Sequence, residues 1–259
     1  MLQLANLCYI CNIVALINFI LVEPSNNSNS LEAKKLSKSY GSNKAINNLS
    51  FSVNDGEIYC LLGQNGAGKT TTISIFLGLI QPTSGEALIN GISVNNKDII
   101  SKHIAYIPEV VQLYGNLTGK ENLDFFSRLA GEKHSQSKLN EYLIHVGLPE
   151  KVIGQPLENY SKGMRQKVGI AIALSKKTSF ILMDEPTSGL DPKATEEFAQ
   201  ICKTLSQNGT GIFMATHDIF NAVNIGDRIG IMKEGGIVHE SNTTDITAQE
   251  LQKLYLKTI

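Results

Sequence analysis

The amino-acid sequence predicts a mixed α/β fold, in which strands and helices alternate through most of the 259 residues. Short apolar or alternating runs of strand length recur from residue 31 onward. Apolar residues at helical spacing follow several of these runs. A glycine-rich segment, residues 63–70, joins one such run to one such helix. The length is sufficient for one large α/β domain, or two small ones, with a well-buried core.

The composition is that of an ordinary folded protein, with 42% apolar and 18% charged residues and a net charge of −1. These values argue against global disorder. They include no basic excess, so we expect no nucleic-acid partner. Cys60 lies in an apolar run and is predicted to be a buried strand residue. Cys8 and Cys11 have metal or redox spacing, but no second Cys or His pair accompanies them nearby, and we interpret the spacing as chance. This cysteine usage fits a reducing, cytoplasmic setting.

Residues 1–22 contain no charged side chain, and about 20 such residues could span a bilayer core as a helix. A secretory signal needs a positively charged start, whereas the first basic residue is Lys34, so we discard that interpretation. Two alternatives stay open. One is a membrane helix. The other is an extension outside the functional domain, including one that results from a wrongly assigned start. Residues 23–30, rich in Asn and Ser, indicate a linker.

The asparagines of this segment weaken the membrane alternative. They recur at steps of six residues, which places their amides roughly 120° apart around a helix. Amides so placed cannot share one buried face, so each would meet lipid or need its own partner. The same arrangement excludes a clean amphipathic surface helix. The asparagines are Asn6, Asn12 and Asn18.

The predicted elements of the first half begin at residue 31. Strands are expected at residues 31–36, 45–53, 58–62, 87–89 and 104–107. Helices are expected at residues 69–80 and 122–129, the second opened by a capping box formed by Thr118 and Glu121.

The middle of the chain, about 113–160, is mostly helical and interrupts the series of strands, which suggests an inserted helical subdomain. Beyond it we predict a buried strand, a helix, a further strand and a closing hairpin. Their ranges are 179–183, 193–207, 211–215, and 229–232 with 236–239.

A phosphate-binding loop is predicted at Gly63-x-x-x-x-Gly68-Lys69-Thr70, because the pattern follows an apolar strand and opens a helix. Glycines let backbone N–H groups curl around phosphates, and Lys69 supplies a positive charge to the β and γ oxygens. Thr70 offers a hydroxyl to Mg²⁺, and the dipole of the helix favours an anion at its N-terminus. The nucleotide-binding residues predicted in this segment are Gly63, Gln64, Asn65, Gly66, Ala67, Gly68, Lys69, Thr70 and Thr71.

Two acids, Asp184 and Glu185, end the apolar run that begins at Phe180. An apolar strand ending in acids places carboxylates at the edge of the sheet where ligands bind in such folds. Asp184 is suited to hold Mg²⁺, directly or through water. Glu185 is then free to polarise the attacking water as a general base. Together with the phosphate loop, the two acids predict an ATP-hydrolysing site.

A further motif resembles one of the ATP-binding cassette (ABC) ATPases. The segment 159–168 precedes the acidic strand at the spacing of that family's signature, usually Leu-Ser-Gly-Gly-Gln. Ser161 and Gly163 keep the pattern, whereas Lys162 replaces the first Gly and Met164 the Gln; the Leu is replaced as well, by a Tyr. Physically, Ser161 is predicted to be the N-cap of a helix over 162–174, whose N-terminus would face a phosphate.

The resemblance covers about residues 31–242, the expected ATPase domain. Residues 1–30 then form an N-terminal extension with a linker, and residues 243–259 a C-terminal helical tail. The implied fold is a phosphate-loop NTPase core, a mixed sheet flanked by helices, with an antiparallel β subdomain and the inserted helical subdomain.

Other family positions can be matched to this sequence. Ser188-Gly-Leu-Asp191 resembles the D-loop, which crosses the dimer interface. His217 resembles the switch histidine that contacts the γ-phosphate, and Tyr40 resembles the aromatic residue that stacks on adenine. The implied catalytic residues are Glu185, His217 and Lys69.

One departure concerns the Q-loop, where the family normally has Gln and this sequence has Glu109. A glutamate still accepts from water and faces Mg²⁺, but it adds a negative charge and cannot donate when ionised. Pro108-Glu109, Leu113-Tyr114 and the signature variant resemble the ABC-2 group of bacterial exporters. The implied metal-binding residues are Thr70, Asp184 and Glu109.

The resemblance implies an ATP-binding and ATP-hydrolysing subunit that powers a transporter, in the direction of export, through a separate integral membrane permease. A second ATPase subunit, identical or paralogous, would complete each ATP site with its Ser161 and Gly163. Such a subunit is peripheral, at the cytoplasmic face of the cell membrane. The cargo is not encoded here, since the permease selects it.

Two other classes of nucleotide-binding protein fit the sequence less well. A soluble ABC protein acting on ribosomes or DNA usually carries two cassettes or a long coiled-coil insertion, and this sequence has neither. A phosphate-loop GTPase shows a guanine-reading Asn-Lys-x-Asp, whereas Asn43-Lys44 is followed here by Ala45-Ile46. Neither a GTPase nor a kinase explains the signature residues Ser161 and Gly163.

Overall fold

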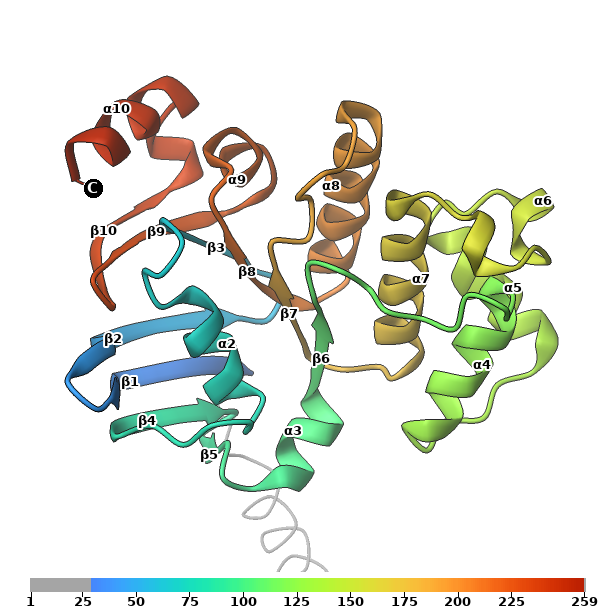
Figure 1. The fold of residues 1–259 in the computed structure, drawn as a ribbon, viewed down its shortest axis with the longest axis horizontal. Helices are drawn as coiled ribbons and strands as arrows, with labels where there is room; N and C mark the ends of the chain where they lie inside the picture. The colour runs from blue at the N-terminus through green and yellow to red at the C-terminus, as the bar shows by residue number, and fades with distance from the viewer. Residues whose placement is uncertain (1–28, 259) are drawn as a thin grey trace, which may run out of the picture.

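The computed structural model describes residues 29–258 (Figure 1). The predictions for the apolar run 1–22, for the pair Cys8 and Cys11 and for nearly all of the linker lie outside the described residues. None of the helices between residues 29 and 258 has the length and apolar character that crossing a bilayer requires.

A six-stranded mixed sheet forms the centre of the fold, with strand order β10-β9-β3-β8-β7-β6. Neighbouring strands pair in parallel, except β10, which runs antiparallel to β9 and confirms the predicted closing hairpin. The strands are β3 (Ile58–Leu62), β6 (Ile104–Ile107), β7 (Phe180–Asp184), β8 (Gly211–Thr216), β9 (Arg228–Lys233) and β10 (Gly236–Asn242).

A second, four-stranded sheet is antiparallel throughout, with strand order β2-β1-β4-β5. It forms the antiparallel β part of the predicted fold and lies beside α2 in Figure 1. Its strands are β1 (Ser30–Tyr40), β2 (Asn43–Asn54), β4 (Ser84–Ile89) and β5 (Ile92–Ser93).

The helices flank the large sheet, and α4, α5 and α6 form a group on the far side of α7 from the strands (Figure 1). This group is the inserted helical part of the predicted fold. The helices are α2 (Lys69–Phe76), α3 (Lys97–His103), α4 (Gly119–Leu129), α5 (Gln136–His145), α6 (Glu150–Ile153), α7 (Lys162–Ser175), α8 (Pro192–Gln207), α9 (Ile219–Ile225) and α10 (Ala248–Thr258).

Strand β3 explains how the sheet is stabilised, because its side chains alternate between two apolar cores. Ile58, Cys60 and Leu62 pack against the helices on one face. Tyr59 and Leu61 pack on the other face, against α2 and the antiparallel sheet. All five are buried, as expected of a parallel strand covered on both sides. The predicted burial of Cys60 is confirmed, and burial raises the pKa of its thiol to about 12.

Hydrogen bonds confirm the predicted starts of α4 and α7, whereas the predicted end of α2 is wrong. Thr118 and Glu121 form a complete capping box at the start of α4. The hydroxyl of Ser161 accepts a hydrogen bond from the backbone N–H of Met164 at 3.2 Å and caps α7. Helix α2 ends at Phe76, not near residue 80, because Gly78 adopts a left-handed conformation with φ +65° that stops the helix.

Candidate active site

The glycine-rich loop lies between β3 and α2 and curls around a buried lysine. Lys69, the first residue of α2, is 5% exposed. Its Nζ donates to the carbonyl oxygens of Gly63 at 2.6 Å and Gln64 at 3.3 Å. A buried ammonium inside a loop at a helix N-terminus is well placed to stabilise an anion.

Asp184 ends β7 and faces this loop. Its Oδ2 accepts a hydrogen bond from the hydroxyl of Thr70 at 2.9 Å, which joins the end of β7 to the start of α2. Burial raises the pKa of Asp184; the hydrogen bond from Thr70 opposes this rise, and the negative charge of Glu185 adds to it. Its other oxygen, Oδ1, is buried and has no hydrogen-bond partner among the described residues.

These oxygens fit a hard divalent cation such as Mg²⁺. The free, buried Oδ1 of Asp184 and the hydroxyl of Thr70 are suitable ligands, and Glu109 is one of the residues that line the same cavity. Between residues 29 and 258, no three His, Cys, Asp or Glu side chains are grouped so that they could hold a metal by themselves. A magnesium ion would therefore need the hydroxyl, water or substrate phosphates as additional ligands.

Glu185 is held in an unusual conformation directly after β7. Its φ of +45° lies in the left-handed region, where a residue with a Cβ is strained and where functional residues are concentrated. Its Oε2 accepts hydrogen bonds from the Nδ1 of His217 at 2.8 Å and from the backbone N–H of His217 at 3.2 Å. Its Oε1 lies 3.4 Å from Nζ of Lys69, close enough for an ion pair but without hydrogen-bond geometry. One carboxylate therefore joins the ends of two strands to the loop lysine.

Lys69, Asp184 and Glu185 line one cavity of about 470 Å³. Its volume lies within the ordinary range of ligand sites. Among the predicted residues, Gly63, Ala67, His217, Ser161 and Gly163 do not line it. The residues that do are Tyr40, Asn43, Ala45, Gln64, Asn65, Gly66, Gly68, Lys69, Thr70, Thr71, Glu109, Asp184 and Glu185.

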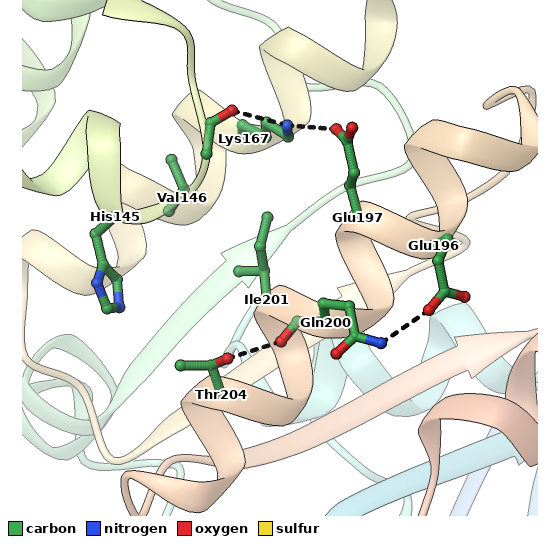
Figure 2. A pocket seen from close by; sticks show the side chains of 9 residues that line it. His145, Val146, Lys167, Glu196, Glu197, Gln200, Ile201 and Thr204 are labelled. Atoms are coloured by element: carbon green, nitrogen blue, oxygen red, sulfur yellow. Dashed lines mark hydrogen bonds and ion pairs between the residues drawn. The ribbon is translucent and has the colours of Figure 1, made fainter.

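A second cavity, of about 440 Å³, lies between α5, α7 and α8 and contains none of these residues (Figure 2). Its buried cation, Lys167, donates to Glu197 Oε2 at 2.7 Å and to the carbonyl oxygen of Gly147 at 3.0 Å. The lysine is thus already paired and joins α7 to α8. The chemistry that the sequence predicts belongs to the cavity at the phosphate loop.

Comparison with known proteins establishes the family. A family model described as ABC transporter matches residues 46–188, more than half of the chain. The chain belongs to the ABC transporter family. The bacitracin transport ATP-binding protein BcrA of Bacillus licheniformis is 39% identical to it over 81% of this chain and 69% of that protein. The linearmycin resistance ATP-binding protein LnrL of Bacillus subtilis is 34% identical over 85% of this chain and 71% of that protein.

The same family is found among solved structures. A dimeric ATP-binding cassette in a post-hydrolysis state with ADP and Pi matches with a TM-score of 0.73 and 28% identity, covering 82% of this chain and 98% of the cassette. The predicted ABC ATPase and its phosphate-loop NTPase fold are therefore confirmed. The chain is an ATP-binding and ATP-hydrolysing subunit of ABC transporter type, and the GTPase, kinase and soluble-factor alternatives are not supported.

Sequence reasoning missed two residues of the ABC cavity, Asn43 and Ala45, at the start of β2. Their position in the sequence could have identified them. They follow Tyr40 after a tight turn, which brings the chain back beside the residue predicted to stack on adenine. The signature residues Ser161 and Gly163 begin α7 and lie apart from the cavity of their own chain.

Tyr40→Ala is expected to raise the KM of this ABC ATPase for ATP about tenfold with kcat little changed, because stacking of a base on an aromatic ring is lost. The ring is half exposed, lines the cavity and carries Nζ of Lys38 over one face, 5.0 Å from the ring centroid. The prediction is that the opposite face receives the purine. Steady-state kinetics measure the effect, with Tyr40→Phe as the control that retains the ring. An equal KM for the Ala and Phe variants would exclude stacking on Tyr40.

Proposed function

We propose that this ABC ATPase powers an exporter as one of a pair of cassettes bound to a separate membrane permease. The proposal depends on one observation: Lys69, Asp184 and Glu185 line the same cavity at the phosphate loop. The relatives named for bacitracin transport and linearmycin resistance favour export. The subunit would lie at the cytoplasmic face of the membrane, where ATP is available.

The proposed division of the chain follows the sequence. Residues 31–242 act as the cassette, with the helical subdomain at about 113–160. Residues 243–259 are a C-terminal tail, and residues 1–30 an extension with a linker. Exposed apolar side chains on and before α4 support a contact between the helical subdomain and the permease, since exposed apolar groups of this kind mark interaction surfaces. They are Val110, Tyr114, Phe125 and Leu129.

The chain's own residues supply the chemistry of hydrolysis. With ATP in the cavity, the ammonium of Lys69 turns to the phosphate oxygens, and Glu185 Oε1 loses the cation beside it. This oxygen then accepts a proton from the attacking water, as a general base does. His217 holds the other carboxylate oxygen and fixes its direction. The bond between the γ-phosphorus and its bridging oxygen breaks as the water attacks, which gives ADP and phosphate.

Mg²⁺ would be held by Thr70 and Asp184, with Glu109 facing it directly or through water. When bound, the ion neutralises negative charge on the β and γ oxygens. The buried, unpaired Oδ1 of Asp184 supports this assignment.

Ser161 and Gly163 are proposed to act on the ATP of a partner chain. They begin α7, a helix of 14 residues whose N-terminus favours a phosphate, and they do not line their own cavity. A similar cassette of known structure is dimeric. The ATP site would then be composed of two chains, and neither chain alone would complete it.

Mixing two inactive variants tests the composite site. Lys69→Met is expected to disable the phosphate loop, and Ser161→Glu to place a carboxylate against the partner's phosphate. In an equal mixture half of the dimers are mixed, and each has one intact site, so up to about a quarter of the native turnover should return. Phosphate release measures it, and either variant mixed with itself is the control. If the rate of phosphate release by the mixture never exceeds the mean rate of the two variants alone, the site is complete within one chain.

A further inference from the structure

Two residues that depart from the ABC pattern contact the same serine. Glu109 stands where the family normally has Gln, and Lys162 where it has Gly. The hydroxyl of Ser188 donates to Glu109 Oε1 at 2.9 Å, across 79 residues of sequence. Nζ of Lys162 donates to the carbonyl oxygen of Ser188 at 2.5 Å. A carboxylate and an ammonium thus hold one residue of the segment 186–191, which we call the interface loop.

A buried glutamine one turn further along α7 shows that these contacts belong to a built junction. Nε2 of Gln166 donates to the carbonyl oxygens of Pro186 at 2.9 Å and Glu109 at 3.3 Å. Gln166 is 1% exposed, so these bonds are shielded from water. The hydroxyl of Thr187 accepts from Nδ2 of Asn221 at 3.1 Å. The beginning of the interface loop is therefore fixed by neutral groups, whereas Ser188 is held by two charged side chains.

The junction adjoins the nucleotide cavity. Ser188 follows Glu185 by three residues, and its backbone N–H donates to the carbonyl oxygen of Glu185 at 3.1 Å. Glu109 is one of the residues that line the cavity, and its carboxylate accepts from Ser188. It therefore serves two neighbours, a serine of the interface loop and whatever occupies the cavity.

We infer that Glu109 and Lys162 are positioning residues that hold Ser188, and that Glu109 gives up Ser188 when it turns to Mg²⁺ in the cavity. Lys162 is then the one charged side chain that still holds Ser188, while Gln166 and Asn221 keep the beginning of the loop in place. The part of the loop from Ser188 onward is less restrained and can move toward a partner chain. This inference rests on the proposed nucleotide and Mg²⁺ site. The residues usual in the family lack the charged contacts, because Gly has no side chain and the amide of Gln accepts a weaker, uncharged hydrogen bond.

Hydrogen–deuterium exchange of the full chain tests the inference. Exchange is followed in peptides covering residues 186–191 and 63–71, without nucleotide, with ADP, and with ADP and Mg²⁺. Adding Mg²⁺ to the ADP-bound chain should speed exchange in the interface loop about tenfold, the effect of losing one hydrogen bond to a charged group. Ser188→Ala should exchange at the faster rate in every state, with no further response to Mg²⁺. Ser188→Thr, which keeps the hydroxyl, should behave as the native chain.

Thr247→Ala is the matched control. It also removes a hydrogen bond from a hydroxyl to a carboxylate, the one that Thr247 Oγ1 donates to Glu250 Oε2 at 2.7 Å at the start of α10. This variant should leave the response of the interface loop to Mg²⁺ unchanged. The inference is overturned if Ser188→Ala exchanges like the native chain, or if Mg²⁺ protects residues 63–71 further without affecting the loop. If ADP gives residues 63–71 no protection at all, the proposed nucleotide site fails, and this inference with it.

Discussion

Glu185→Gln is expected to lower ATP turnover about 10²- to 10⁴-fold while ATP binding is retained, because the amide cannot accept the proton of the attacking water. The substitution keeps the length of the side chain and an oxygen that can accept from His217. The ion pair with Lys69 at 3.4 Å is replaced by a weaker interaction between the ammonium and a neutral amide, which frees the ammonium for phosphate. Single-turnover phosphate release measures the chemical step, and equilibrium dialysis of ATP measures binding.

The variant should also accumulate as an ATP-bound dimer, since the γ-phosphate that joins the two chains is no longer removed. Size-exclusion chromatography with and without ATP detects this species. Glu197→Gln is the matched control, because it removes a charge that pairs with Lys167 in the cavity between α7 and α8. It should hydrolyse at the native rate. Hydrolysis by Glu185→Gln at the native rate would show that another group is the base.

The parts of the site that follow β3 and β7 were predictable from the sequence because local patterns determine them. An apolar strand of five buried residues, a glycine loop and a helix place Lys69 and Thr70 without reference to the rest of the chain. Capping residues gave the starts of α4 and α7. The end of α2 was missed, because apolar residues continue past Phe76 and conceal the stop at Gly78.

The contacts between distant segments could not be predicted. The bond between Glu109 and Ser188 joins residues 79 positions apart, and that between Lys162 and Ser188 joins residues 26 apart. The sequence around Glu109 or Lys162 contains no signal for a contact with Ser188. The three residues meet because α7 packs against the segment that contains Glu109 and against the interface loop. The family pattern identified Glu109 and Lys162 as departures. It gave no indication that the two departures meet at one residue.

Gly68→Ala is expected to lower ATP affinity about 100-fold or more, equivalent to about 3 kcal/mol, because the loop cannot keep its shape. Gly68 is the N-cap of α2, with φ +114° and ψ 0°, a conformation that residues with a Cβ rarely adopt. A Cβ there would lie 2.3 Å from the carbonyl oxygen of Ala45 and 2.7 Å from Cε of Met232. The methionine side chain can move, but the carbonyl oxygen belongs to β2. Relief would therefore displace the start of α2, and Lys69 with it.

Gly66→Ala separates this steric effect from backbone strain. Gly66 also has a positive φ, +87°, but, apart from Gly66 itself and its two chain neighbours, no heavy atom of residues 29–258 would lie within 4 Å of its Cβ. This variant should carry only the strain of the left-handed region, about 1–3 kcal/mol of stability, and should bind ATP more tightly than Gly68→Ala. Titration with a fluorescent ATP analogue gives the affinities, and urea unfolding gives the stabilities. Equal losses in the two variants would mean that strain in the loop backbone, and not its contact with β2, preserves the phosphate site.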